Sequence, residues 1–490
     1  MTTHTRPTGR GTGMHHRHIY LDGAWTASTG RCVIDVVEPA TEQVIGSAPG
    51  GTPEDVDAAV RAARRAFAGW AETPAGERAA YLRRIAEGIE RRAPDLAELI
   101  AREVGTPIGF ARLAQVGLAA LAFRTAADVG EAYPYEQPQG PSLLIREPFG
   151  VVGAITPWNY PLFQVAAKAA YALVVGNTVV IKPSEAAPLS VFVLAEIMDE
   201  AGLPAGVVNL VSGTGPVAGQ ALATHPDVDF VSFTGSTAVG RTITRAAADT
   251  VKRVALELGG KSPTVLLADA DVADVVPRAV AAAFVNNGQT CCALTRLVVP
   301  RSRKGEVERA AAKAAESTQV GHPLLPGTQL GPLVSAGQRD RVLRHVRRAL
   351  GQGATLITGG AEPPEDQPYG YYVRPTVLSD VTTAMDVQHE EVFGPVLVIE
   401  CYEDDVEDDA DAEAVALANA TPYGLAAAVW SADPDRALAV ARRIRAGQVE
   451  VNGGGFNPRA PFGGYRQSGN GREHGVFGLE EFLEVKSVQL

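Results

Sequence analysis

The stretch Thr178-Val-Val-Ile-Lys-Pro-Ser-Glu185 joins a short apolar run to a polar turn. Similar strand-like runs recur on both sides of it, at residues 142–146, 151–155, 207–211 and 230–233. Helical stretches rich in Ala and Leu separate the runs at residues 178–181, 207–211 and 230–233. Short apolar strands that alternate with helices indicate a parallel sheet of the α/β class.

A second alternation follows residue 262, with strand-like runs at residues 264–267, 297–299, 396–399 and 426–430. The chain has 490 residues, whereas a single hydrophobic core stops growing at about 250–300 residues. We therefore expect two α/β domains.

The first part of the chain is predicted to combine a strand pair with helices. Residues 19–25 have a strand–turn–strand pattern. Thr52 can cap a helix with Asp55 three residues on, and apolar residues then recur at three- and four-residue steps. Residues 78–104 and 110–129 are predicted as further helices.

Two segments are predicted to lie outside the packed core. Residues 1–17 are rich in Thr, Gly, Arg and His and are predicted to form a disordered extension. A metal tract is the alternative, but no Cys or carboxylate accompanies these histidines, so we expect no metal. The acidic run at residues 403–411 is predicted to be a solvated, extended loop. A cation site is the alternative there, although the run lacks the turn glycine of a calcium loop.

Composition and charge argue against several classes of protein. Charged residues make up 20% of the chain, hydrophobic residues 46%, and the net charge is −12. Because a phosphate backbone needs clustered Lys and Arg, neither nucleic acid nor an anionic membrane is expected as a partner. No apolar run reaches the roughly 20 residues of a membrane helix, and the N-terminus has no signal core. Four cysteines make no disulfide framework, so we expect a cytoplasmic protein.

Two segments contain residues suited to covalent catalysis, Phe284-Val-Asn-Asn-Gly-Gln-Thr-Cys-Cys292 and Glu257-Leu-Gly-Gly-Lys261. The first delivers a cysteine after a Gly-Gln turn, and the second carries a carboxylate flanked by glycines. Nucleophile and base on separate segments are what a thioester-forming mechanism needs. Both segments resemble the aldehyde dehydrogenase superfamily, and the resemblance extends from Ile19 to Val488.

The resemblance implies an aldehyde dehydrogenase-like α/β fold with a Rossmann-type NAD-binding domain, an α/β catalytic domain and a small β segment for oligomerisation. The NAD-binding domain would comprise residues 18–127 and 149–259, and the catalytic domain residues 260–460. Residues 128–148 and 477–490 would form the oligomerisation segment. In the family the strand at the end of the chain pairs with a neighbouring subunit, which implies a homodimer or homotetramer.

Candidate cofactor residues lie where strands end, the place where α/β sheets bind nucleotides. Glu185 can accept hydrogen bonds from both hydroxyls of a ribose and would repel a 2′-phosphate, which favours NAD over NADP. Gly235 lets the backbone approach a pyrophosphate, and Ser236 can cap the helix that follows. Without the family resemblance, the alternative for Glu185 is a solvated surface position. The alternative for Gly235 and Ser236 is an ordinary turn between a strand and a helix. The cofactor set that the resemblance implies is Thr156, Trp158, Lys182, Ser184, Glu185, Gly215, Phe233, Gly235, Ser236, Leu258, Glu391 and Phe393.

The resemblance assigns the nucleophile to Cys291, two residues after the Gln of the motif, with Cys292 as a neighbour that lines the pocket. Hydride would leave the thiohemiacetal of a small-molecule aldehyde. The Asn159 amide and the backbone N–H of Cys291 would form the oxyanion hole. Glu257 would activate the water that hydrolyses the thioester.

Further family positions surround this site. Lys168 and Glu473 match a proposed proton relay, and a structural ion pair is the alternative. Gln164 and Ala167 stand where several relatives carry larger residues, which predicts a roomier or more polar tunnel and argues against a betaine aldehyde. Arg459 either suits an anionic semialdehyde or faces solvent. The expected tunnel residues are Tyr160, Gln164, Ala167, Thr290, Cys292, Phe456 and Phe462, of which Phe462 could equally belong to the core.

Three functions are consistent with the chain. An NAD-dependent, hydrolytic aldehyde dehydrogenase is preferred. An enzyme that passes the acyl group to coenzyme A is the second, but relatives of that kind commonly lack the base at Glu257. A non-catalytic scaffold is the third, and the joint presence of Cys291, Asn159, Glu257 and Glu185 argues against it.

Overall fold

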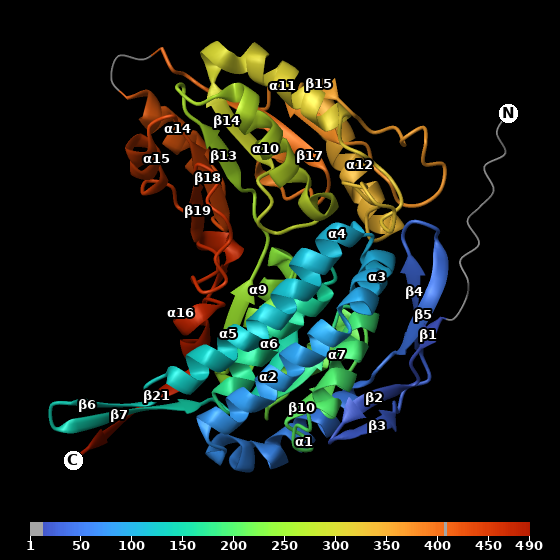
Figure 1. Cartoon of the computed structure of the whole chain (residues 1–490), viewed down its shortest axis with the longest axis vertical. Coiled ribbons are helices and arrows are strands. Elements are labelled where there is room, and N and C mark those ends of the chain that lie inside the picture. The colour runs from blue at the N-terminus through green and yellow to red at the C-terminus, as the bar shows by residue number, and fades with distance from the viewer. Residues whose placement is uncertain (1–12, 406–408) are drawn as a thin grey trace.

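The computed structural model describes residues 13–405 and 409–490, and two large sheets dominate it (Figure 1). The eight-stranded sheet lies in the lower half of the figure, and its five central strands run parallel. In order across the sheet, the strands are β20 (Gly469–Asn470), β12 (Arg253–Glu257), β11 (Phe230–Thr234), β8 (Val151–Ile155), β9 (Thr178–Lys182), β10 (Val208–Leu210), β2 (His18–Leu21) and β3 (Ala24–Ala27).

The seven-stranded sheet lies in the upper half, and all its pairs are parallel except β15 with β16 (Figure 1). The predicted α/β class is thus confirmed, and each run predicted as a strand between residues 142 and 430 contains one. The strands are β15 (Thr355–Thr358), β16 (Thr376–Ser379), β17 (Val396–Tyr402), β14 (Arg296–Pro300), β13 (Pro263–Leu266), β18 (Ala426–Trp430) and β19 (Gln448–Val451). The helices α10 (Val272–Phe284), α11 (Lys304–Glu316), α12 (Ala336–Gly351), α13 (Asp386–His389), α14 (Ala410–Asn419) and α15 (Pro434–Ala441) belong to this half.

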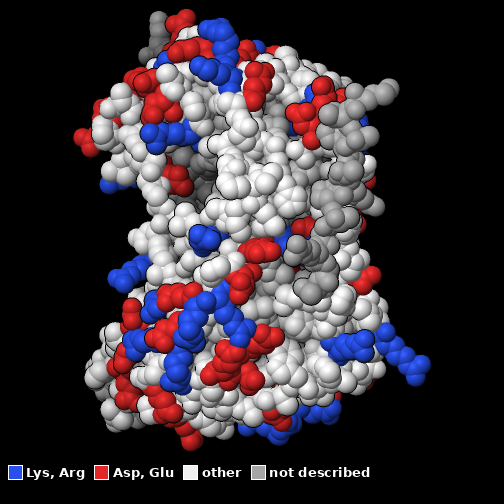
Figure 2. All heavy atoms as spheres, turned by 45° about the vertical axis from the view of Figure 1, so that its right-hand side comes forward, with Lys and Arg blue, Asp and Glu red and all other residues white. Residues whose placement is uncertain are grey.

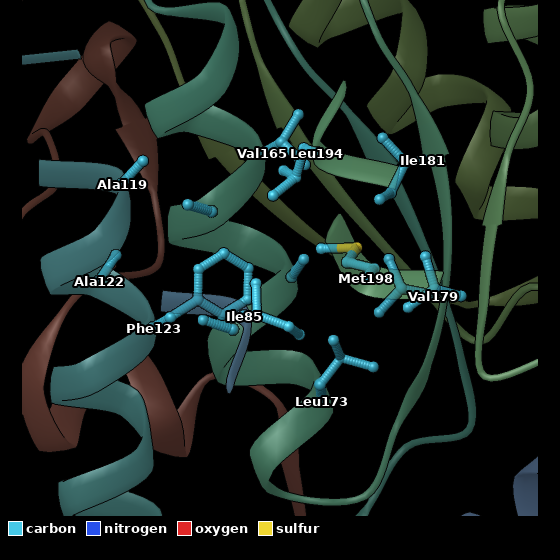
Figure 3. Packing of buried hydrophobic residues seen from close by; sticks show 14 of the residues in the cluster. Ile85, Ala119, Ala122, Phe123, Val165, Leu173, Val179, Ile181, Leu194 and Met198 are labelled. Atoms are coloured by element: carbon cyan, nitrogen blue, oxygen red, sulfur yellow. The ribbon is translucent and has the colours of Figure 1, made fainter. Parts of the chain in front are cut away.

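Both faces of the eight-stranded sheet are covered by helices, as expected for parallel strands. Helices α2, α5, α6 and α7 cover one face, and α1, α8 and α9 cover the other. Figure 3 shows part of the core on the first face, where Ile85 and Phe123 lie together and Met198 lies beside Val179 of β9. The helix bounds are α1 (Pro53–Glu72), α2 (Ala75–Arg91), α3 (Ala93–Val104), α4 (Ile108–Phe110), α5 (Leu118–Ala132), α6 (Pro161–Val174), α7 (Leu189–Glu200), α8 (Gln220–Thr224), α9 (Thr237–Ala247) and α16 (Gly475–Glu480).

The predicted helix starts follow from local chemistry. Thr52 and Asp55 form a reciprocal capping box at the start of α1, which confirms that prediction. The helical stretch predicted at residues 78–104 is divided into α2 and α3 at Arg92, because Pro94 stands in the first turn of α3 and cannot donate a helical hydrogen bond to the turn before it.

The prediction of a disordered extension is wrong for residues 14–16, whereas residues 1–12 lie outside the described residues. Met14–His15 forms β1, which pairs with β5 (Gln43–Pro49), and β5 pairs in turn with β4 (Val33–Glu38). The His16 ring stacks on Phe192 with 4.2 Å between ring centres. Backbone pairing and aromatic contact therefore order a segment whose composition alone indicated disorder.

The C-terminal strand has one partner within its own chain, and its pairing with a neighbouring subunit stays a prediction. Strand β21 (Leu483–Gln489) pairs with β7 (Ser142–Pro148) of its own chain, and β7 pairs with β6 (Glu136–Gln139). Helix α16 packs on α5 and so brings β21 beside β7. The three strands form the arm at the lower left of Figure 1, in which β21 is an edge strand.

The acidic run is only partly a loop. Residues 406–408 lie outside the described part, but Asp409 caps α14 by accepting the Ala412 N–H at 3.0 Å, so the run ends in the first turn of a helix. Earlier in the run, Asp404 accepts the backbone N–H of Ser302 at 3.1 Å.

The surface carries mixed charge. On the face in Figure 2, Lys and Arg atoms are interspersed with Asp and Glu atoms. The described residues include exposed ion pairs such as Arg83 with Glu131. Within residues 13–405 and 409–490, none of the helices is both long enough and apolar enough to span a bilayer.

Candidate active site

The candidate site lies where the carboxyl ends of β8, β11 and β12 face the loop after α10. The cavity there is lined by Asn159, Glu257, Cys291, Glu391 and Phe393, among other residues. The structure thus brings together side chains that are up to 234 positions apart (393 − 159) in the sequence. We call this space the catalytic cavity.

The loop that carries the cysteines has an unusual backbone. Asn286, Asn287 and Gly288 follow one another with positive φ angles of 49°, 61° and 71°. Asn adopts this region more readily than most residues, and Gly does so without steric cost. A Cβ on Gly288 would lie 2.2 Å from the backbone of Gly394, so only Gly allows this close approach. The three residues turn the chain sharply and place Cys291 at the catalytic cavity.

Cys291 and Cys292 are both half-buried and unbridged. A hydrogen bond with the Cys292 thiol, followed by burial, raises the pKa of Cys291 well above its ordinary value. The resting thiol is therefore protonated at neutral pH, and a base has to take its proton before attack on a carbonyl. Cys292 packs instead against the apolar cluster of Leu294, Ala426 and Ala428, and it does not line the catalytic cavity.

Asn159 follows β8 and lines the catalytic cavity together with Cys291. Its Nδ2 donates to the backbone oxygen of Gln289 at 2.9 Å, which uses one of the two amide N–H groups. The second N–H is left for a ligand oxygen in the catalytic cavity. This geometry suits the predicted oxyanion donor.

Glu257 ends β12 and is 5% exposed. Burial, followed by repulsion from Glu473, raises the pKa of Glu257 well above its ordinary value. Its Oε2 has no hydrogen-bond partner among the residues described. Lys168 and Glu473 form a buried ion pair of 2.5 Å behind it. The structure thus contains the ion pair that was one of the two alternatives for these residues, placed within electrostatic reach of Glu257.

A second cavity continues from the first along the ends of β8, β9 and β11. Lys182 and Glu185 line it and lie 3.2 Å apart, and Glu185 also accepts the Gly215 N–H at 3.3 Å. Burial alone would raise the pKa of Glu185. The charge of Lys182 and hydrogen bonds from backbone N–H groups, including that of Gly215, outweigh burial and lower the pKa. Ser236 caps α9 at the cavity wall. We call this space the nucleotide cavity; it shares Pro157, Trp158, Thr234, Gly235 and Ser236 with the catalytic cavity.

Glu391 and Phe393 close the far side of the catalytic cavity. Glu391 accepts the Gly260 N–H at 3.1 Å, and burial raises its pKa to about 7. The Phe393 ring meets Trp158 edge to face at 5.4 Å. A Cβ on Gly259 would lie 2.2 Å from a Glu391 carboxylate oxygen, so the glycine leaves room for this side chain.

Comparison with known proteins identifies the family. The model of the aldehyde dehydrogenase family matches residues 25–488. The chain belongs to the aldehyde dehydrogenase family.

Relatives of known name and structure agree with this membership. The chain is 46% identical over 474 residues to a 3-succinoylsemialdehyde-pyridine dehydrogenase from a Pseudomonas species, covering 96% of this chain and 98% of that one. It is 48% identical to the crystal structure of an aldehyde dehydrogenase C mutant from Pseudomonas syringae in complex with NAD+ and octanal, with a TM-score of 0.95 and 97% and 96% of the two chains covered. An NAD+ complex of a Bacillus cereus aldehyde dehydrogenase is 39% identical, with a TM-score of 0.92 and 97% and 96% covered. The predicted family, enzyme class and NAD cofactor are therefore confirmed.

The predicted tunnel residues of this aldehyde dehydrogenase have different surroundings in the structure. The Tyr160 hydroxyl and Thr290 Oγ1 lie 2.8 Å apart, and Phe456 and Phe462 form an aromatic pair at 6.4 Å. Gln164 instead lines the catalytic cavity and accepts a hydrogen bond from Thr234 at 3.1 Å. Ala167 is 1% exposed and lines neither cavity, so it packs in the core.

Sequence analysis missed three residues of the site. His474 stacks on Phe163 and contacts both Phe456 and Phe462. Gln338 donates to the Phe393 carbonyl at 2.8 Å, and Arg341 donates to the Glu391 carbonyl at 2.9 Å. His474 adjoins Glu473, and this neighbour could have pointed to it. No local motif marks the other two.

Proposed function

We propose that this aldehyde dehydrogenase oxidises an aldehyde to a carboxylic acid with NAD, through a thiohemiacetal and a thioester on Cys291. The observation that supports it most is the convergence of Cys291, Asn159 and Glu257 on one cavity that opens into the nucleotide cavity. The Cys291 sulfur bonds to the aldehyde carbon, and the Asn159 amide stabilises the oxyanion. Glu257 then removes a proton from the water that hydrolyses the thioester.

The nucleotide cavity fits NAD on its own chemistry. Lys182 and Glu185 offer a donor and a carboxylate at a strand end, as a ribose requires. The Thr156 hydroxyl lines the cavity, is buried, and lacks a hydrogen-bond partner in the described part of the chain. Ser236 and the start of α9 suit a pyrophosphate. When bound, NAD accepts the hydride of the reaction.

An assay of NADH absorbance tests this function directly. Across a panel that includes octanal and semialdehydes, we expect NADH to form without coenzyme A. Activity that requires coenzyme A would favour the acyl-transferring alternative. Absence of activity with every aldehyde would favour the scaffold alternative.

The charge of Glu185 sets the preference for NAD in this proposal. We expect the wild-type enzyme to prefer NAD over NADP in kcat/KM, and Glu185→Gln to reduce that preference by about tenfold or more, because removing one repulsion of roughly 1.4 kcal/mol changes a ratio tenfold. Steady-state kinetics with both cofactors measure it. Glu87→Gln, which removes an exposed carboxylate on α2, is the control. Equal use of both cofactors by the wild-type enzyme would refute the ribose assignment.

Glu391 makes cofactor affinity depend on pH. Its pKa of about 7 means that the carboxyl is protonated below neutral pH and charged above it. A charged carboxylate makes roughly twice as strong a hydrogen bond to a hydroxyl, so we expect the Kd for NAD to fall as the pH rises from 6 to 8.5. Calorimetric titration should show this slope in the wild type and in Glu185→Gln, but not in Glu391→Gln. The same slope in Glu391→Gln would exclude this carboxyl as its source.

We further propose that the enzyme is a cytoplasmic homodimer or homotetramer with the domain bounds implied by the family. Two features support self-association. Strand β21 is an edge strand, and apolar side chains are exposed at Val485 on β21 (60%) and at Phe477 on α16 (58%). All four cysteines are free, which suits a reducing compartment.

A further inference from the structure

The backbone carbonyl of Asn159 is held by two side-chain amides. Gln115 Nε2 donates to Asn159 O at 2.8 Å, and Asn286 Nδ2 donates to the same oxygen at 2.9 Å. Gln115 is 0% exposed and Asn286 3%. A carbonyl oxygen has two lone pairs, so these donors occupy both. We call Gln115 and Asn286 the carbonyl clamp.

The clamp also touches the segment that carries the nucleophile. Asn286 Nδ2 lies 3.5 Å from Gln289 O, the oxygen that accepts the Asn159 side-chain amide at 2.9 Å. One amide group thus spans the backbone of the oxyanion donor and the peptide two residues before Cys291. Asn286 has the left-handed backbone described above, which Asn tolerates.

A third residue holds the clamp itself. Thr106 Oγ1 donates to Asn286 Oδ1 at 2.7 Å and lies 3.5 Å from Gln115 Nε2. Gln115 belongs to a π-helical segment, Ala111–Gly117, between α4 and α5. Such segments are rare and often occur at functional sites. Residues before α5 therefore reach a site otherwise built from residues beyond 155.

We propose that the carbonyl clamp positions the Asn159 amide for the oxyanion at Cys291, an inference that rests on the proposed function. Neither Gln115 nor Asn286 lines the catalytic cavity or the nucleotide cavity, and Gln115 reaches the site through the Asn159 carbonyl. Because Asn159 O loses one of its two donors without Gln115, its peptide can shift and turn the amide away from the thiol. A misplacement of about 1 Å costs roughly 100-fold in rate.

The variant Gln115→Met keeps the length of the side chain and removes its donor. We expect the single-turnover rate constant of NADH formation to fall by about 10- to 100-fold. The Kd for NADH and the rate of Cys291 alkylation by iodoacetamide should stay within about twofold of the wild type, well below the tenfold of a 1.4 kcal/mol change. Gln388→Met is the matched control, since Gln388 is equally buried and donates to the Ala420 carbonyl at 2.9 Å. It should leave the single-turnover rate unchanged.

A double-mutant cycle separates positioning from general damage. In an Asn159→Ala background, Gln115→Met should cause no further loss. A wild-type rate in Gln115→Met, or an additive loss in the double variant, would overturn the clamp while leaving the proposed function intact. A wild-type rate in Asn159→Ala would overturn the oxyanion assignment and the clamp together. If Gln115→Met fails to fold, Thr106→Val removes the hydroxyl that holds Asn286, and the same two outcomes apply to it.

Discussion

Replacing Cys291 with Ala should reduce NADH formation by a factor on the order of 10⁴ or more, whereas Cys292→Ala should retain most of the activity. Loss of a nucleophile removes the covalent route, and in other enzymes this costs up to about 10⁶ in kcat. Only Cys291 lines the catalytic cavity with Asn159 and Glu257, whereas Cys292 packs against an apolar cluster. Steady-state NADH absorbance with a reactive aldehyde measures both variants.

Two checks accompany this comparison of the cysteines. Cys401→Ala, which alters a half-buried thiol far along β17, controls for removal of a cysteine. Mass spectrometry of a reaction quenched during turnover should find the acyl group on Cys291. Activity in Cys291→Ala with loss in Cys292→Ala, or an acyl group on the second cysteine, would show that the nucleophile has been assigned to the wrong position.

Glu257→Gln should form about one NADH per active site and then nearly stop. The amide keeps the shape of the side chain but cannot take a proton from water, and general-base catalysis contributes about 10²- to 10⁴-fold. Because the pKa of Glu257 is raised, its ionised fraction grows as the pH rises, so wild-type turnover limited by hydrolysis should increase with pH. The variant should lose that increase. Stopped-flow absorbance resolves the burst from the steady state.

Glu103→Gln serves as the control for Glu257→Gln, because Glu103 is also buried with a raised pKa but does not line the catalytic cavity. It should keep both the burst and the steady rate. Continuous wild-type turnover by Glu257→Gln would remove this residue from the role of base. Absence of the burst itself would instead place Glu257 before the thioester, in removing the proton of Cys291.

The strands, and the candidate residues that line the catalytic cavity together, could be predicted because their signals are local. The run before Lys182 is short and apolar, and the fragment around Gln289 carries its turn and its cysteine within a few residues. Residues that act through buried long-range contacts carry no such signal. Gln115 donates to a carbonyl 44 positions away, and Gln338 to one 55 positions away. Their burial and direction depend on the whole fold.

Two other differences have the same origin. Composition suggested that the segment at Met14 is disordered, yet pairing with β5 orders it. The tail at Leu483 was expected to form a strand, but the pairing of that strand with β7 of the same chain, to which α16 brings it, was not predicted. In both cases the structure of the segment depends on a strand that is far away in the sequence. A local sequence pattern does not say which strand lies next to the segment in the fold.

The close approach of Gly288 to Gly394 has a thermodynamic consequence. Gly394 adjoins Phe393, at the cofactor side of the cavity, and Gly288 lies three residues before Cys291. The segment at the cofactor side and the segment that carries the thiol therefore meet backbone to backbone here, with no room for a side chain at residue 288. Any coupling between dinucleotide binding and acylation that this contact transmits must be reciprocal, so that each changes the free energy of the other by the same amount.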